Sequence, residues 1–209
     1  MSNQDASVLI AKGAAELGLS IDQHQINQLL DFTRLIEKWN KTHNLTAITQ
    51  LDDMLVKHIL DSLSIATHLP SGTILDVGSG AGLPGIPLSI VSTNKQFTLV
   101  DSSSKRVAFL KEVKRKLALT NVSPIHSRVE DLKTQTFEII TSRAFSSIFE
   151  MIKKTEHLLA EQGCWLAMKG LYPESEINEV SAYCKVKNSI QLIVPGLAAE
   201  RHLIEIVRS

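Results

Sequence analysis

The stretch that most constrains the fold is DVGSGAGLPG, Asp76 to Gly85, which carries glycines at positions 78, 80, 82 and 85. The apolar run before it, Thr73 to Val77, predicts a strand, and Ile86 to Val91 predicts a helix. A glycine-rich turn between a strand and a helix is typical of the first βα unit of an open parallel sheet, where ligands bind at the carboxyl ends of the strands. Because glycines have no Cβ, such a loop can adopt positive φ and let a ligand touch the main chain. We therefore expect a parallel sheet with a ligand site above this loop.

The rest of the chain predicts helices first and an alternation of strands and helices afterwards. Ser20-Ile-Asp-Gln23 has the spacing of a capping box, and apolar residues then recur at helical intervals from Leu29 to Trp39 and from Leu55 to Ala66. Further strands are expected at 97–100, 122–125, 137–140 and 165–168, with helices at 105–117 and about 145–159. Two last apolar runs, 189–194 and 203–207, flank Pro195-Gly196 and predict antiparallel strands. The expected organisation is a helical N-terminal cap, 1–70, within the same globule as an α/β domain at 71–209.

Composition narrows the class of protein. With 209 residues, 44% of them hydrophobic and 21% charged, the chain suits one globular core. It shows neither a secretory leader nor an apolar run of membrane-spanning length, so we expect a cytoplasmic protein without membrane contact. Lys+Arg and Asp+Glu both total 22, so nucleic-acid binding would require a local basic patch. Cys164 and Cys184 predict small buried side chains, and because clustered ligands are absent we expect no metal.

Two classes of ligand compete for the glycine loop. Gly80-x-Gly82-x-x-Gly85 satisfies the dinucleotide fingerprint, whereas Asp76-x-Gly78-x-Gly80-x-Gly82 is the form typical of S-adenosylmethionine (AdoMet) sites. Pro84 and Pro87 remove two N–H donors from the first turn of the helix, where a diphosphate would be held. AdoMet has no phosphate, so the prolines favour it. A tight turn that binds nothing is the third interpretation.

Acidic residues after the next two strands fit a cofactor of either class. Asp101 closes the second strand, where an acid can accept hydrogen bonds from ribose hydroxyls, although it could equally cap the following helix. After the third strand, Val129 beside Glu130 could flank an adenine ring and meet its amino group. The alternative there is a solvated helix start, because acids are favourable near a helix N-terminus.

At this point the motifs resemble a known family. ILDVGSGAGLPGIPLSI, SRVED, TSRAF, KWNKTHNLTAI and ERHLIEI, in order from about Trp39 to Ile206, are similar to segments of the bacterial 16S ribosomal RNA guanine-N7 methyltransferases, the glucose-inhibited division protein B family. The resemblance implies a class I (Rossmann-like) AdoMet-dependent methyltransferase sheet. It also implies methyl transfer from AdoMet to N7 of a guanine in 16S rRNA, at nucleotide 527, with the rRNA or the small ribosomal subunit as partner.

Carried over to this chain, the resemblance implies AdoMet contacts at Gly78, Leu83, Val129, Glu130 and Arg143. Gly80 and Gly82 join this set as part of the glycine loop, and Asp101 joins it by its position. The planar guanidinium of Arg143 suits the cofactor carboxylate, a substrate phosphate or an internal ion pair.

The predicted chemistry needs no catalytic acid or base. The fourth strand lacks the (Asp/Asn/Ser)-Pro-Pro-(Tyr/Phe) segment of exocyclic-amine methylases, and no cysteine nucleophile lies near that rim. Guanine N7 offers an in-plane lone pair without a proton, so attack on the sulfonium methyl requires only positioning. We therefore predict no catalytic residue.

Candidate RNA contacts are less distinctive. Helix 105–117 has an apolar side and a basic side. The basic side could bind RNA phosphates or could simply be a solvated face. Other candidate substrate residues are Asn40, His43, Asn44, Lys169 and Arg201, with structural ion pairs as the alternative for the last two. Trp39, in the same segment, fits the core better.

Two other functions remain open, an NAD(P)-dependent oxidoreductase and an RNA-binding module without activity.

Overall fold

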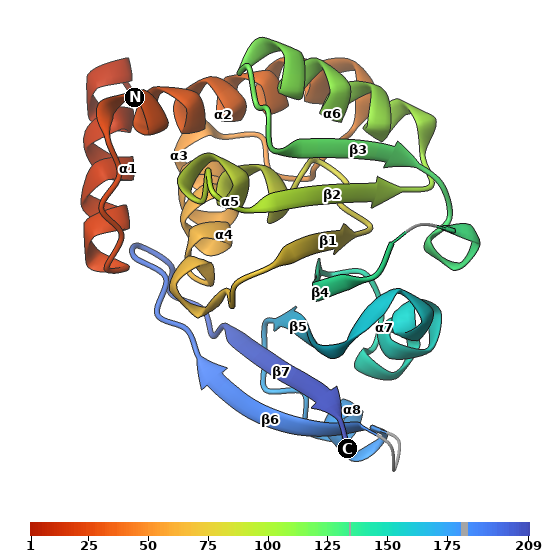
Figure 1. Ribbon diagram of the computed structural model, residues 1–209. Coiled ribbons are helices and arrows are strands. Elements are labelled where there is room, and N and C mark those ends of the chain that lie inside the picture. Colours follow the sequence, from red (N-terminus) through yellow and green to blue (C-terminus); the bar gives the residue numbers. More distant parts are fainter. Residues whose placement is uncertain (134, 181–183) are drawn as a thin grey trace.

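The computed structural model describes residues 1–133, 135–180 and 184–209. Its centre is a seven-stranded sheet (Figure 1). The strands are β1 (Thr73–Val77), β2 (Gln96–Asp101), β3 (Val122–His126), β4 (Phe137–Arg143), β5 (Leu159–Lys169), β6 (Cys184–Gln191) and β7 (His202–Arg208). Their order is β3-β2-β1-β4-β5-β7-β6.

Helices fill most of the connections. The α-helices are α1 (Asn3–Glu16), α2 (Gln23–His43), α3 (Leu51–Met54), α4 (Asp61–Leu63), α5 (Gly85–Val91), α6 (Ser104–Lys116), α7 (Ile148–Thr155) and α8 (Glu174–Asn178). The shorter helical segments are η1 (Leu55–Leu60), a π-helix, and the 3-10 turns η2 (Ala66–His68), η3 (Val129–Asp131) and η4 (Glu156–Leu158). The α/β class is therefore as predicted.

The sheet is parallel from β3 to β5, and β7 then runs antiparallel to β5 and β6 antiparallel to β7. The antiparallel pair predicted on either side of Pro195-Gly196 is confirmed. β1 pairs with both β2 and β4, so the connections leave it in opposite directions. Ligands of open α/β sheets bind at such a switch point, beyond the carboxyl ends of the strands.

Side chains that alternate along each strand build two hydrophobic layers. Ile74 faces a cluster shared with α2, α5 and α6, whereas its neighbour Leu75 faces a cluster shared with α7. Both faces of the central strands are covered, which explains why these strands read as continuous apolar runs.

The N-terminal helices pack on the first of these layers. Ile10 of α1, Phe32 of α2 and Leu55 of η1 are fully buried in the same cluster as Phe109 of α6. The sequence did not predict α1, whose alanine-rich stretch lacks a strong apolar stripe. The division into a cap at 1–70 and a domain at 71–209 stays a prediction.

Several predicted boundaries are wrong in detail. The capping box lies two residues later, because Asp22 caps α2 and exchanges hydrogen bonds with Gln25. The helix expected from Leu55 to Ala66 is instead a chain of short segments around the π-helix. The last predicted strand pair is shifted at its first member, because 184–191 and not 189–194 pairs with β7.

Cys164 and Cys184 are buried, as predicted, and burial raises the pKa of the Cys164 thiol to about 11. Among the residues that the structure describes, no helix has the length and apolar character needed to cross a membrane. The same residues include no cluster of three or more metal-ligating His, Cys, Asp or Glu side chains.

Candidate functional site

A cavity of about 330 Å³ opens at the carboxyl ends of β1, β2 and β3. It is lined by Val77, Gly78, Val100, Asp101, Ser102, Arg106, Ser127, Arg128, Val129, Glu130, Ala144, Phe145 and Lys154. Four of the predicted cofactor residues, those at 78, 101, 129 and 130, thus come together from three successive strand ends. We refer to this space as the first cavity.

Gly78 lines the first cavity at the end of β1, whereas Gly80, two residues further along the loop, is not part of the lining, and its predicted cofactor contact stays a prediction. Gly78 has φ +67°, and an added Cβ would lie 2.5 Å from Cδ2 of Phe145, so the position excludes a side chain by both conformation and space. Gly80, at φ +57°, donates its N–H to Oδ2 of Asp101 at 2.9 Å. The loop therefore presents bare main chain next to an acid.

The other half of the loop packs against the protein itself. A Cβ on Gly82 would lie 2.7 Å from Ile86 Cγ1, and Leu83 is 5% exposed within the hydrophobic cluster. A Cβ on Gly85 would lie 2.7 Å from Oδ2 of Asp76. Close packing thus explains the small residues at 82 and 85. The cofactor contacts predicted at Gly82 and Leu83 stay predictions.

Asp101 makes internal hydrogen bonds at the rim of the first cavity, and its predicted contact with ribose hydroxyls stays a prediction. Its Oδ1 accepts the N–H of Ser103, the residue that precedes α6, at 2.8 Å, while its Oδ2 accepts the N–H of Gly80. Arg106 lies 3.5 Å from the same carboxylate. Although only 4% exposed, Asp101 lines the first cavity, so it ties the loop to the helix start and still meets the ligand space.

The opposite wall comes from η3 and the segment after β4. Val129 is buried at the wall, whereas Glu130 is exposed and lies 3.7 Å from Nζ of Lys154. The Lys154 ammonium also lies 5.6 Å from the centre of the Phe145 ring. This wall therefore places an apolar side chain beside an acid, and the adenine contact predicted there stays a prediction.

Asp76 lies beneath the loop. Its Oδ2 accepts the N–H of Gly85 at 3.1 Å, and its Oδ1 has no partner among the described residues. Complete burial raises the pKa of this carboxyl to about 7. Asp76 thus holds the loop from below and is partly protonated near neutral pH.

A second cavity, of about 430 Å³, adjoins the first. It is lined by Ile48, Lys57, His58, Asp61, Arg143, Ala144, Met168, Lys169, Gly170, Leu192, Arg201 and His202. Ala144 belongs to both linings and has φ +55°, in the left-handed region. Both spaces therefore border the residue that follows β4.

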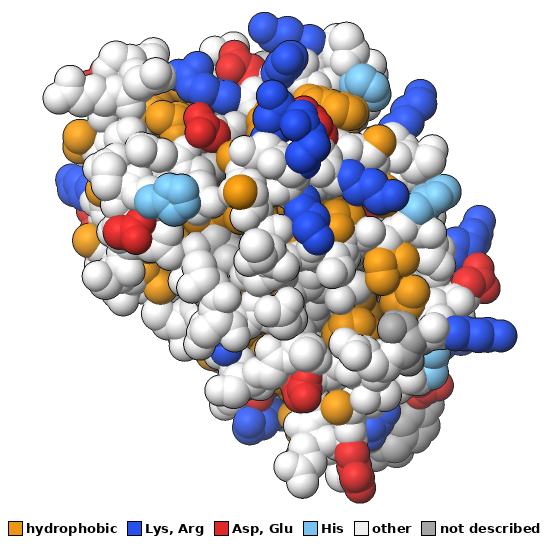
Figure 2. Space-filling view, turned by 45° about the horizontal axis from the view of Figure 1, so that its top comes forward, with side chains coloured by type: hydrophobic (Ala, Val, Ile, Leu, Met, Phe, Trp, Pro, Cys, Tyr) orange, Lys and Arg blue, Asp and Glu red, His pale blue; other side chains and the backbone are white. Residues whose placement is uncertain are grey.

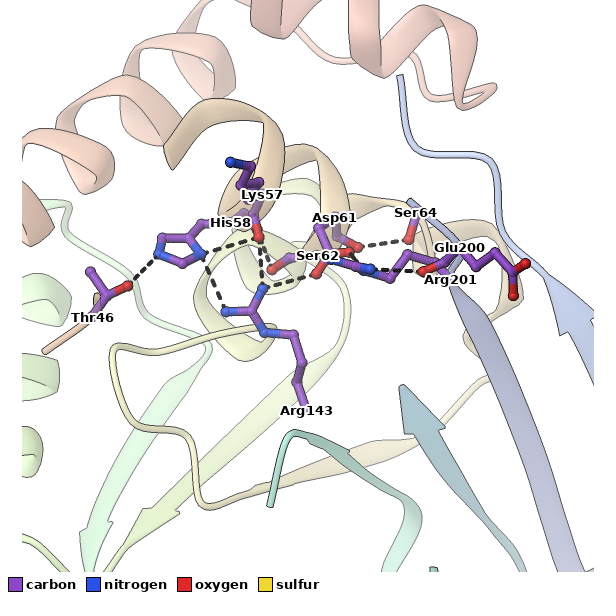
Figure 3. A network of polar contacts seen from close by, with 9 residues as sticks. All are labelled: Thr46, Lys57, His58, Asp61, Ser62, Ser64, Arg143, Glu200 and Arg201. Carbon is purple, nitrogen blue, oxygen red and sulfur yellow. Dashed lines mark hydrogen bonds and ion pairs between the residues drawn. The ribbon is translucent and has the colours of Figure 1, made fainter. Parts of the chain in front are cut away.

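Arg143 lies along the second cavity and makes internal contacts there (Figure 3). Its Nη1 donates to Oδ2 of Asp61 at 2.9 Å and to the carbonyl of Lys57 at 3.0 Å. Its Nη2 lies 3.4 Å from Nδ1 of His58. The internal ion pair considered for Arg143 is thus present, and its predicted contact with AdoMet stays a prediction.

His58 joins Arg143 to the segment after α2. Its Nε2 lies 2.8 Å from Oγ1 of Thr46, and the main-chain N–H of Thr46 donates to Oδ1 of Asn40. Burial, followed by the nearby Arg143 charge, lowers the pKa of His58 to about 4. The imidazole is therefore neutral at physiological pH and adds no charge to the cavity.

The remaining candidate substrate residues divide into two groups. Lys169 and Arg201 line the second cavity, and each also has an acidic partner: Glu176 at 2.7 Å for Lys169, and Asp61 at 2.6 Å for Arg201. The group at the end of α2 lies elsewhere. Oδ1 of Asn40 accepts the N–H of Thr46, the His43 ring lies tilted beside Trp39 with ring centres 4.7 Å apart, and Asn44 follows the helix at φ 48°.

Sequence reasoning missed Lys57, His58 and Asp61. They share the stretch LVKHILDSL, where polar residues interrupt an otherwise apolar helix pattern. Because buried polar groups are nearly always partnered, such an interruption signals a polar site inside the fold. The pattern could have been noticed, but not the distant partners at Arg143 and Arg201.

The basic face of α6 is exposed. Figure 2 brings α2 and α6 toward the viewer and shows Lys and Arg side chains gathered in its upper half, with acidic and hydrophobic side chains among them. Lys105, Lys111 and Lys116 are exposed, whereas Arg115 is paired with Glu112 at 2.9 Å. The apolar side of α6 is buried as predicted, and RNA contact through the basic side stays a prediction.

Comparison with known proteins gives a consistent result. The family model described as rRNA small subunit methyltransferase G matches residues 25–204. The ribosomal RNA small subunit methyltransferase G of Actinobacillus pleuropneumoniae serotype 5b is 48% identical over 186 residues, which cover 89% of this chain and 91% of that protein.

Solved structures show the same fold at low identity. M. jannaschii TYW2, solved in complex with AdoMet, aligns with a TM-score of 0.57 at 15% identity over 73% of this chain and 76% of that one. A SAM-dependent methyltransferase from Aquifex aeolicus aligns with a TM-score of 0.57 at 17% identity over 74% and 93%. The predicted class I methyltransferase sheet is confirmed.

Proposed function

This chain belongs to the rRNA small subunit methyltransferase G family, and from that premise we propose that it methylates N7 of a guanine in 16S rRNA, at nucleotide 527 as the resemblance implies. It is an AdoMet-dependent methyltransferase. Its partner is 16S rRNA or the small ribosomal subunit, and we propose that it works in the cytoplasm. Family membership favours methyl transfer over the oxidoreductase and the inactive RNA-binding module.

The observation that carries the proposal is the pair of adjoining cavities that share Ala144. A methyl donor and a base must approach within van der Waals contact in line, so their sites have to meet at one point. The first cavity lies where this fold class binds cofactors, and the second is open to a nucleotide. Ala144 marks the place where the methyl group would cross.

The first cavity fits AdoMet in size and chemistry. Its volume of about 330 Å³ falls within the usual range for small-molecule sites, roughly 300–1,000 Å³. Gly78 supplies bare main chain at one wall, and Asp101 supplies carboxylate oxygens for ribose hydroxyls. Val129 and Glu130 supply an apolar surface and an acceptor for the adenine amino group. These residues would hold the cofactor.

The second cavity suits a nucleotide of RNA. Its charged lining residues are four cations, Lys57, Arg143, Lys169 and Arg201, and one carboxylate, that of Asp61. Glu176 beside Lys169 and Asp53 beside Lys57 offset two of these cations. The net positive charge that remains, carried by the two arginines around Asp61, favours a phosphate group. The place of Arg143 in this lining supports a substrate phosphate over the cofactor carboxylate as its ligand.

The chemistry asks the protein for position and not for proton transfer. When bound, AdoMet supplies an electrophilic methyl group on its sulfonium. The lone pair of guanine N7, which carries no proton, would form the new N–C bond as the C–S bond breaks and S-adenosylhomocysteine leaves, so no general base is needed. The residues of the second cavity would hold the guanine nucleotide, and Ala144, with its single methyl group, would leave the passage between the cavities open.

The test is transfer of a radiolabelled methyl group from AdoMet to 16S rRNA isolated from cells that lack this modification. We expect label in the rRNA, found as N7-methylguanosine when the nucleotides are mapped, and none in rRNA that already carries the modification. Binding of rRNA without any transfer would favour the inactive RNA-binding module. Binding of NADH in place of AdoMet would favour the oxidoreductase.

A further inference from the structure

Asp61 occupies a central place in the second cavity. Its side chain is 3% exposed, and both carboxylate oxygens are engaged: Oδ2 with Nη1 of Arg143 at 2.9 Å, and Oδ1 with Nε of Arg201 at 2.6 Å. The three residues come from α4, from the end of β4 and from the segment before β7 (Figure 3). One buried acid thus joins the N-terminal helices to two distant parts of the sheet.

Stability alone is a poor explanation for this arrangement. Burying the Asp61 carboxylate and partly burying the two guanidinium groups costs desolvation energy that their attraction only partly offsets, and apolar residues of similar volume often do as well. What an ion triad does provide is fixed geometry, because a carboxylate and a guanidinium meet through directed hydrogen bonds. The arrangement therefore suggests a requirement for orientation.

The triad leaves both arginines with further capacity to bind an anion. Each guanidinium carries five N–H donors. Arg143 uses Nη1 twice and directs Nη2 toward His58, and Arg201 uses Nε and one Nη1 donor, the latter to the carbonyl of Glu200. With one negative charge against two positive ones, the triad also keeps a net charge of about +1.

The surroundings hold Arg143 without neutralising it. His58 and the carbonyl of Lys57 both contact its guanidinium, and His58 is itself held by Thr46. Neither contact brings a negative charge. Arg143 also directly precedes Ala144, which borders both cavities, so a change in its position moves the wall beside the reacting atoms.

We propose that Asp61 is a positioning residue for methyl transfer: by bridging Arg143 and Arg201, it orients both guanidinium groups toward a phosphate of the RNA substrate in the second cavity. The inference rests on the proposed function and adds to it. Asp61 itself repels a phosphate, so it acts only through the two arginines. If Asp61 only reduced the positive charge of the cavity, its removal would strengthen RNA binding and leave kcat unchanged.

The variant Asp61→Asn separates these roles, because it keeps the side-chain size and removes the charge. We expect kcat at saturating 16S rRNA to fall by about 10- to 100-fold, since small misplacements near reacting atoms cost this much. Affinity for RNA should be unchanged or tighter, and affinity for AdoMet unchanged. Asp52→Asn, an exposed acid in α3, removes the same charge and should behave as the wild type. An unchanged kcat with tighter RNA binding would show that Asp61 only reduces the positive charge of the second cavity.

Arg201→Lys provides a second, milder test. It keeps the positive charge but loses the directed Nε–H bond to Asp61. If orientation matters, Arg201→Lys should lower kcat as Asp61→Asn does, and the double variant should lose little more than either alone. Additive losses, or a wild-type kcat in Arg201→Lys, would overturn the inference.

The same assays distinguish failure of the proposed function from failure of the role proposed for Asp61. If wild-type protein transfers no methyl group to unmodified 16S rRNA, the proposed function falls. If wild type is active and both Asp61→Asn and Arg201→Lys keep its kcat, only the role of Asp61 falls. The midpoint of thermal unfolding is measured for each variant. A midpoint above the assay temperature shows that the variant is folded in the assay, so that a lower kcat reports lost positioning and not lost folding.

Discussion

At the scale of single residues, glycines of the same loop make room for different neighbouring groups. Gly78 lines the first cavity beneath Phe145, whereas Gly82 makes room for Ile86 and Gly85 for Asp76. A glycine-rich motif is therefore partly a packing motif. Among these positions, Gly78 is the one at which a small side chain would most directly disturb the ligand space.

We expect Gly78→Ala to weaken AdoMet binding at least tenfold in calorimetry. The added Cβ would lie 2.5 Å from the Phe145 ring and displace it from the cavity wall, in addition to the strain of about 1–2 kcal/mol at positive φ. The matched control is Gly18→Ala, which shares the positive φ (+75°) but has open space around it. Equal AdoMet affinity in the two variants would remove Gly78 from the cofactor site.

At the scale of elements, one hydrogen bond connects α7 to β5. The indole N–H of Trp165 donates to Oγ1 of Thr155 at 2.8 Å, and both side chains are fully buried. The Thr155 hydroxyl in turn donates to the carbonyl of Met151. Because α7 also carries Lys154 at the wall of the first cavity, this bond helps to place that wall.

Thr155→Val tests this connection, since it keeps the shape of the side chain and leaves the indole N–H without an acceptor. We expect the free energy of unfolding to fall by about 1–3 kcal/mol in urea. Thr155→Ser keeps the hydroxyl and should lose only about 1 kcal/mol for the missing methyl group. A valine variant as stable as the wild type would contradict this role.

At the scale of the whole molecule, His58 helps to hold the N-terminal helices to the sheet. It contacts Thr46 on one side and Arg143 at the end of β4 on the other. Burial, reinforced by the Arg143 charge, lowers its pKa from 6.5 to about 4, so folding favours the neutral ring. The contact should therefore be sensitive to acid.

The sign follows from which state binds the proton. Between pH 6.5 and about 4 the unfolded chain protonates His58 and the folded chain does not, so stability falls as the pH falls through this window. We expect the wild type to lose up to roughly 3 kcal/mol relative to His58→Gln over that range, measured by urea unfolding at each pH. Contributions common to both proteins, such as that of Asp76, cancel in the comparison. Parallel stability curves would show that His58 is not buried neutral.

Local features of this chain could be predicted from its sequence more closely than contacts between distant residues. Repeating apolar positions predicted β1 from Thr73 to Val77 and α6 to within one residue, because periodicity follows from local backbone geometry. The broken helix 51–63 was not predicted, because its apolar spacing is the same as that of an ordinary α-helix and carries no sign of the π-helical segment at 55–60. Among site residues, those that directly follow strands were brought together as expected, because parallel strands share one carboxyl edge.

By itself, the sequence determined the alternating sheet, the glycine loop at its first crossover and the acids at the next strand ends, because strand order in this fold class places them on one rim. Only the tertiary structure decided that Arg143 meets Asp61 and that Arg201, 140 residues beyond Asp61 in the chain, shares the same carboxylate. Partners so far apart leave no local pattern. They are chosen by the packing of the N-terminal helices against the sheet, which brings one buried charge within reach of two others.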